Sequence, residues 1–88
     1  MKINKKEISE LSYTSKINFI QQDKYIEELV NDENAYIRML IAKRGHKLDK
    51  LIYDENQFVK NEAIKYCKQH SYKPECRKIL QLYNLYNL

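Results

Sequence analysis

The chain has 88 residues and a net charge of +4, from 16 basic and 12 acidic side chains. One glycine, one proline and 43% hydrophobic residues exclude β-rich folds built from many tight turns, and predict one mainly helical domain over residues 1–88. No apolar run approaches the roughly 18 residues of a membrane span, and the N-terminus lacks the apolar stretch of a signal peptide, so we expect a cytoplasmic protein with no membrane partner.

The first expected unit covers residues 7–28 and is a weak copy of a pattern that is clearer later in the chain. Lys16, Phe19 and Ile20 lie 22 positions before basic or apolar residues of the next unit. The terminal units of a repeat array are usually atypical, because one face of each lacks a neighbouring unit. We therefore interpret this segment as a degenerate N-terminal unit.

Residues 29–50 and 51–72 are two close copies of one 22-residue pattern. They begin "LVNDENAYIR" and "LIYDENQFVK", so a leucine, an Asp-Glu-Asn motif, an aromatic, a β-branched and a basic residue occur twice in the same order. Apolar residues three and four apart before the motif predict a short amphipathic helix, and the apolar stripe after it predicts a longer one. Each unit is therefore expected to be a short helix followed by a long helix.

The ends of the long helices have recognisable signals. Asp32 and Asp54 are the predicted N-caps, since a side-chain oxygen there can accept from the free N–H groups of the first turn; Asn34 and Asn56 are the competing assignments. Gly45, the only glycine, is predicted to end the first long helix in the left-handed conformation.

The segment from Pro74 to the C-terminus is predicted to be a terminal helix, because proline is tolerated in a first helical turn. Leu82, Leu85 and Tyr86 place apolar groups on more than one of its faces. We expect this helix to cover the end of the stack and to offer a contact for a homodimer.

A two-helix unit of this length cannot bury its own apolar face, so about three to four units are expected to stack side by side. The pattern Leu-x-x-Leu-x-x-Asp-x-x-x-x-(Ile/Val)-(Arg/Lys)-x-x-x-Ala-x-x-Gly resembles the short HEAT-like repeats of bacterial proteins and the related leucine-rich repeat variant. The resemblance covers residues 24–67 well and residues 7–23 weakly; the second copy lacks the glycine and moves its alanine to Ala63. It implies an all-α, right-handed α-solenoid with a C-terminal capping helix, which binds macromolecules and catalyses no reaction.

The charged residues are distributed unevenly along each unit. Acidic residues gather at the start of each long helix and basic ones at its end, as the helix dipole favours. Stacked units would then have an acidic edge and a basic edge, and the basic edge could follow a phosphate backbone. The expected members of the basic edge are Lys16, Lys24, Lys43, Arg44, Lys47, Lys65 and Lys68. Arg38 is expected to pair with Asp54 or Glu55 across the boundary between units.

Cys67, His70 and Cys76 form a Cys-x₂-His-x₅-Cys pattern that could supply three zinc ligands. No fourth ligand is evident, and both cysteines lie on apolar stripes, so buried, reduced thiols are the favoured interpretation over a metal site or a disulfide. No nucleophile and base constellation is recognisable. We expect no catalytic residue, no metal and no cofactor.

These features predict a small non-enzymatic macromolecule-binding protein, a protein-interaction module with a protein partner. One subclass is an inhibitor of a host nucleic-acid enzyme from a phage or mobile element. The alternative is a nucleic-acid backbone-binding protein that uses the basic edge. The candidate partner-binding residues are Tyr36, Arg38, Lys43, Arg44, Lys47, Phe58, Lys60, Lys65 and Lys68.

Overall fold

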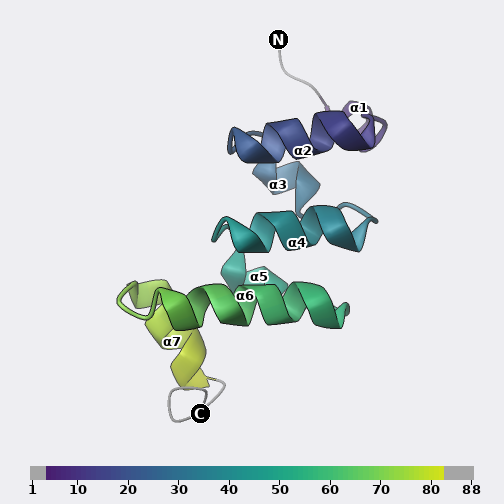
Figure 1. The fold of residues 1–88 in the computed structure, drawn as a ribbon. Helices are drawn as coiled ribbons and strands as arrows, with labels where there is room; N and C mark the ends of the chain where they lie inside the picture. The colour runs from purple at the N-terminus through teal and green to yellow at the C-terminus, as the bar shows by residue number, and fades with distance from the viewer. Residues whose placement is uncertain (1–3, 83–88) are drawn as a thin grey trace.

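The structure is a computed structural model that describes residues 4–82, in which it contains seven helices and no strand (Figure 1). The predicted all-α class is confirmed for this range. Leu85 and Tyr86, two of the expected dimer contacts, lie outside the described residues, and the third, Leu82, is 66% exposed. The helices are α1 (Lys5–Ser9), α2 (Tyr13–Gln21), α3 (Ile26–Leu29), α4 (Ala35–Lys43), α5 (Leu48–Leu51), α6 (Gln57–Gln69) and α7 (Pro74–Leu82).

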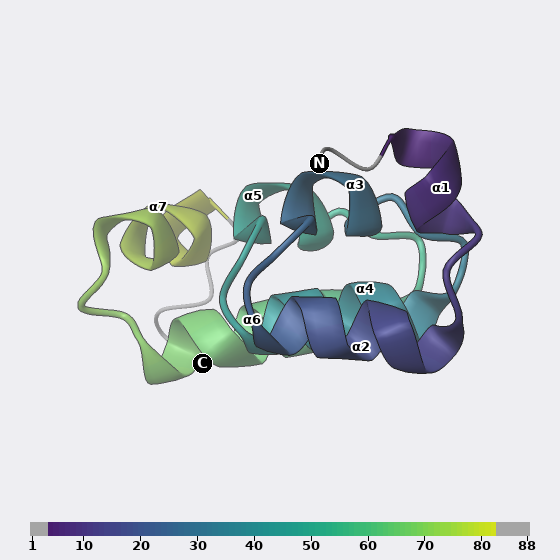
Figure 2. The same cartoon turned by 90° about the horizontal axis from the view of Figure 1, so that it is seen from above.

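The helices form two layers (Figures 1 and 2). One layer contains the longer helices α2, α4 and α6, which lie one after another with their N-terminal ends on the same side. The other layer contains the short helices α3 and α5, with α1 at one end and α7 at the other. The molecule is elongated, with extents of 44 × 23 × 17 Å. None of the helices described is both long and apolar enough to cross a bilayer.

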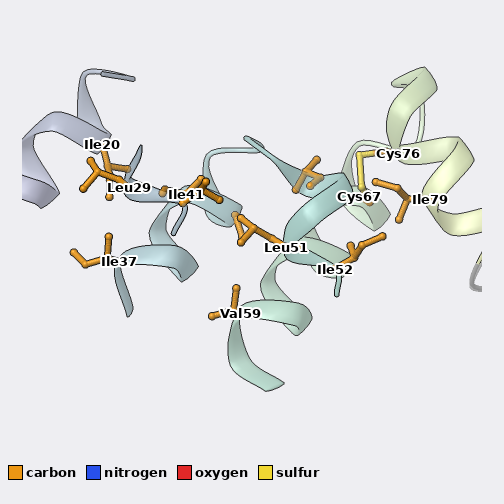
Figure 3. Packing of buried hydrophobic residues seen from close by; sticks show 14 of the residues in the cluster. Ile20, Leu29, Ile37, Ile41, Leu51, Ile52, Val59, Cys67, Cys76 and Ile79 are labelled. Atoms are coloured by element: carbon orange, nitrogen blue, oxygen red, sulfur yellow. A yellow bond between two sulfur atoms is a disulfide. The ribbon is translucent and has the colours of Figure 1, made fainter. Parts of the chain in front are cut away.

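The hydrophobic core lies between the two layers, and residues 22 positions apart occupy matching places in it (Figure 3). The buried pairs are Leu29 with Leu51, Val30 with Ile52, Ile37 with Val59, and Ile41 with Ala63. Ile20 and Ala42 also match, but the next residue in this series, Ile64, is only partly buried. After α6 only α7 follows in the described chain, and it crosses the C-terminal half of α6 (Figure 1).

The loops that follow α2 and α4 have the same backbone conformation. Asp23 and Gly45 have φ of 58° and 78°, and Tyr25 and Lys47 have φ of 57° and 53°, so each loop has two left-handed residues at matching positions. A Cβ on Gly45 would lie 2.2 Å from Cζ of Tyr66, which is too close for any side chain. Gly45 follows the C-cap of α4 as predicted, and glycine is needed there for conformation and for space.

The N-caps of α4 and α6 are Asn34 and Asn56, not Asp32 and Asp54. Asn34 Oδ1 accepts from the Tyr36 N–H at 2.8 Å, and Asn56 Oδ1 accepts from the N–H of Phe58 at 2.9 Å. Each aspartate accepts instead from the backbone N–H of the asparagine two residues later, at 2.9 Å. The aspartates therefore shape the turn before the helix and leave the capping to the amide side chains.

A disulfide joins Cys67 on α6 to Cys76 on α7, and both residues are completely buried (Figure 3). The structure therefore contradicts the expectation of two separate reduced thiols. His70 is not directed to a shared site with them, because its Nδ1 lies 2.8 Å from the Tyr66 carbonyl oxygen and its ring stacks on Tyr66. Residues 4–82 contain no group of three or more His, Cys, Asp or Glu side chains placed to hold a metal ion.

Candidate protein-interaction surface

Three aromatic side chains are exposed at the N-terminal ends of the long helices: Tyr13 on α2, Tyr36 on α4 and Phe58 on α6. We call these three residues the aromatic row. Tyr36 and Phe58 are 45% and 72% exposed. Tyr36 directly precedes the core residue Ile37, and Phe58 directly precedes Val59. Successive side chains on a helix point about 100° apart. Because Ile37 and Val59 point into the core, the aromatic side chains before them point away from it.

The Tyr13 and Tyr36 rings stack with centroids 6.1 Å apart, so the row is continuous between α2 and α4. Partial burial, and then the neighbouring Tyr36 hydroxyl, raise the pKa of Tyr13 above its ordinary value. Between α4 and α6 the row borders an apolar groove of about 310 Å³. The groove is lined by Ala35, Tyr36, Met39, Asn56 and Phe58.

Two lysines lie at the opposite end of the same helix pair. Lys43 and Lys65 follow Tyr36 and Phe58 by seven residues, which is two helical turns, so they share a face with the aromatic residues about 10 Å further along the axis. Both are exposed, and neither forms a salt bridge within residues 4–82. They line a second depression of about 250 Å³, which we call the basic hollow, together with Glu62, Tyr66 and Gln69.

Arg38 is held inside the fold. Its guanidinium donates two hydrogen bonds to Asp54, and the two side chains are only 12% and 8% exposed. Burial alone would raise the pKa of Asp54, but the hydrogen bonds from Arg38 and from the Asn56 N–H outweigh it and hold that pKa below its ordinary value. The predicted pairing is confirmed, and Arg38 is not displayed to a partner.

The expected basic edge carries its own counter-charges. Arg44 and His46 both contact the Asp23 carboxylate at 2.7 Å, and Lys47 pairs with Glu27. The hydrogen bonds from Arg44, and then from His46, hold the pKa of Asp23 well below its usual range. These acidic residues come from the preceding loop and short helix, where they place negative charge among the cations.

The remaining predicted cations are scattered. Lys16 lies on α2 and pairs at 2.6 Å with Asp32, which precedes α4. Lys24 and Lys68 are exposed and form no salt bridge within the described range. Lys60 is half-buried on α6, at the position that Arg38 holds on α4, and it too lacks an ion pair with any described residue. The seven cations expected on one edge do not form a continuous basic strip.

A third depression, of about 620 Å³, lies beside α1, α3 and the start of α4. The lining contains both basic and acidic side chains, and two of them, Lys16 and Asp32, form a salt bridge with each other. Its one hydroxyl group, on Ser9, donates to the carbonyl oxygen of Lys6, and the lining contains no histidine or cysteine. This depression has neither the apolar anchor points of a docking site nor a nucleophile and base.

Of the residues that line this candidate surface, Tyr36, Phe58, Lys43 and Lys65 were predicted from the sequence, but Tyr13 and Met39 were not. Tyr13 lies 23 residues before Tyr36, one position out of the 22-residue register, so the repeat alignment does not pair them.

Comparisons of the chain with family models, with curated proteins and with solved structures found no significant match.

Proposed function

We propose that this chain is a short, right-handed α-solenoid of HEAT-like units that acts as a non-enzymatic protein-interaction module. Its two-layer arrangement supports this proposal, as do the buried residues and left-handed loop residues that recur every 22 positions. In such a stack, residues at one position of each unit form a row across the surface. A row of equivalent side chains on a rigid stack of helices could form a binding surface for a partner protein.

The aromatic row is the observation on which the proposed binding function rests. Tyr13, Tyr36 and Phe58 expose large rings on three successive helices, and Met39 extends the apolar surface into the groove. Aromatic residues and methionine are enriched in protein interfaces, where buried rings contribute much of the binding energy. Packing within the chain does not explain these exposed rings, whereas a partner that covers them does.

The alternative, binding to a nucleic-acid backbone, receives less support. A phosphate-binding strip needs lysines and arginines free to replace counterions. Arg44 and Lys47 instead pair with Asp23 and Glu27. A steep loss of nucleic-acid binding with added salt would favour this alternative, and no retention at low salt would dismiss it.

The test compares partner capture by three forms of the whole protein: wild type, a Tyr36→Ser/Phe58→Ser double variant and a Tyr72→Ser control. Tyr72 is 68% exposed, like Phe58, but lies outside the aromatic row. A protein captured from the native host should bind wild type and the control equally. It should bind the double variant at least about tenfold more weakly, because interface aromatics are typical hot spots. Equal binding to all three forms would contradict the proposed surface.

A further inference from the structure

We infer that the surface between α4 and α6 binds an amphipathic helical segment with an apolar anchor and a carboxylate two helical turns apart. This inference rests on the protein-interaction function proposed above and specifies the chemistry of the partner. It is carried by the position of the apolar groove and the basic hollow at opposite ends of one helix pair.

The groove fits one large apolar side chain. Met39, Tyr36 and Phe58 line a space of about 310 Å³; the two aromatic residues are exposed, and Met39 is partly buried against the core. The polar residues in the groove lining are Tyr36, through its hydroxyl, and Asn56, whose side-chain oxygen already accepts hydrogen bonds from the Phe58 and Val59 N–H groups. A leucine or phenylalanine of the partner would therefore meet a mainly apolar surface, and the Asn56 oxygen would keep its hydrogen bonds.

The hollow favours an acidic group. Lys43 and Lys65 approach it from the two helices, whereas Glu62 is the only carboxylate in its lining. Of the other cations of the expected basic edge, Lys16, Arg44 and Lys47 each pair with an acidic side chain, and Lys24 and Lys68 do not line the hollow. Lys43 and Lys65 form no salt bridge with a described residue and outnumber Glu62, so a carboxylate from outside would meet a net positive charge.

The distance between the two depressions matches a helix. Seven residues separate Tyr36 from Lys43 and Phe58 from Lys65, which corresponds to about 10 Å along a helix axis. A ligand helix that lies across both the groove and the hollow, parallel to α4 and α6, presents residues i and i+7 on one face at the same separation. Docking of an amphipathic helix into a groove is a common mode of peptide recognition. Glu62 lines the hollow and lies between Phe58 and Lys65 along α6, so the ligand position between anchor and carboxylate should not be acidic.

The test uses two 15-residue, side-chain-stapled helical peptides, each with a phenylalanine at position 4, and with glutamate or lysine at position 11. Fluorescence anisotropy measures their binding to the whole protein. Wild type should bind the glutamate peptide about tenfold more tightly than the lysine peptide, since two exposed ion pairs contribute modestly. Lys43→Glu/Lys65→Glu should reverse this preference, and Lys68→Glu, an exposed lysine of α6 outside the hollow, should leave it unchanged.

The two proposals can fail separately. If neither peptide binds, or if the preference survives the Lys43→Glu/Lys65→Glu change, the inference about an acidic helix is overturned. A captured host partner that still depends on Tyr36 and Phe58 would in that case leave the protein-interaction function standing. A partner that is lost on charge reversal at Lys43 and Lys65, and bound normally by Lys68→Glu, supports both.

Discussion

Arg38 on α4 and Asp54, which precedes α6, are joined by two hydrogen bonds, from Nε to Oδ2 at 2.8 Å and from Nη2 to Oδ1 at 3.1 Å. The same guanidinium donates through Nη1 to the main-chain oxygens of Asp32 at 2.7 Å and Glu33 at 3.1 Å. One side chain thus connects the turn before its own helix to the turn before the next long helix. Lys16 and Asp32 make the corresponding contact 22 residues earlier.

Removing Arg38 should therefore weaken the packing of α4 on α6. We expect Arg38→Ala to lower the free energy of unfolding by about 2–3 kcal/mol, because it leaves the partly buried Asp54 carboxylate and two carbonyl oxygens without this donor. Asp54→Ala should cost a similar amount, and the double variant should be at least about 1 kcal/mol more stable than the sum predicts. Urea denaturation of the four proteins measures this coupling.

The pair Arg44 and Asp23 is the matched control for this cycle. It has similar geometry, at 2.7 Å, but its side chains are 40% and 46% exposed, so water screens the interaction. The coupling of Arg44→Ala with Asp23→Ala should be clearly smaller than that of the Arg38 and Asp54 pair. Additive losses at Arg38 and Asp54, or a larger coupling at the exposed pair, would contradict the structural role assigned to Arg38.

The depressed pKa of Asp54 predicts how stability responds to acid. Because the folded-state pKa lies below that of the unfolded chain, the unfolded chain binds the proton first as the pH falls. The contribution of this carboxylate is complete above about pH 5 and is lost as the pH falls through about 4 and then through the folded-state pKa. Asp54→Asn should be less stable than wild type at pH 7 and should show a shallower decline between about pH 5 and 3.

Urea midpoints measured across this pH range check the prediction. The control is Asp49→Asn, since Asp49 is exposed on α5 and forms no salt bridge with the described residues. It should keep the acid-induced decline of the wild type. A decline in Asp54→Asn as steep as in wild type would show that the Asp54 carboxylate does not contribute to acid sensitivity.

Gly45 should not tolerate a side chain, for two separable reasons. A left-handed alanine costs about 1–2 kcal/mol by itself, and its Cβ would overlap the Tyr66 ring, so Gly45→Ala should cost more than conformation alone. In a Tyr66→Ala background the overlap is removed, and the cost of Gly45→Ala should fall to the conformational part. The same cost in both backgrounds, measured by urea denaturation, would exclude the contact with Tyr66 as its cause.

Local sequence signals predicted the features that depend on neighbouring residues. The apolar spacing placed the long helices correctly, and the single glycine marked the end of α4. Arg38 and Asp54 were also predictable as a pair, because residues at fixed places in successive units must meet when the units stack. The N-caps were harder, because aspartate and asparagine both cap helices and only the backbone angles distinguish positions two residues apart.

Features that depend on packing between distant elements were not predictable. The pairing of Arg44 with Asp23 joins residues 21 apart in the sequence, and no local sequence signal indicates that these two side chains meet. The stacking of Tyr13 on Tyr36 falls outside the repeat register, as noted above. The bond between Cys67 and Cys76 depends on how α7 crosses α6, and a helical stripe of apolar residues does not determine that crossing.

The disulfide should stabilise the contact between α6 and α7. Cys67 and Cys76 are nine residues apart, and closing a loop of about this length contributes roughly 2–3 kcal/mol by restricting the unfolded chain. Wild-type protein should therefore have a higher urea midpoint without reductant than with it. Because both cysteines are completely buried, a reductant should act only when the chain opens, so reduction should be slow under native conditions and accelerate in urea.

The reduced chain should still keep α7 in place, because Ile79 and Leu80 are 5% and 2% exposed and pack into the same core. Cys67→Ala/Cys76→Ala should then lose the stabilisation of the bond and an additional amount from the volume of the two sulfur atoms, while its helical circular dichroism remains close to wild type. If the urea midpoint of the wild type were the same with and without reductant, the bond would not contribute to stability. If reduction abolished the helical signal, Ile79 and Leu80 would not suffice to hold the last helix.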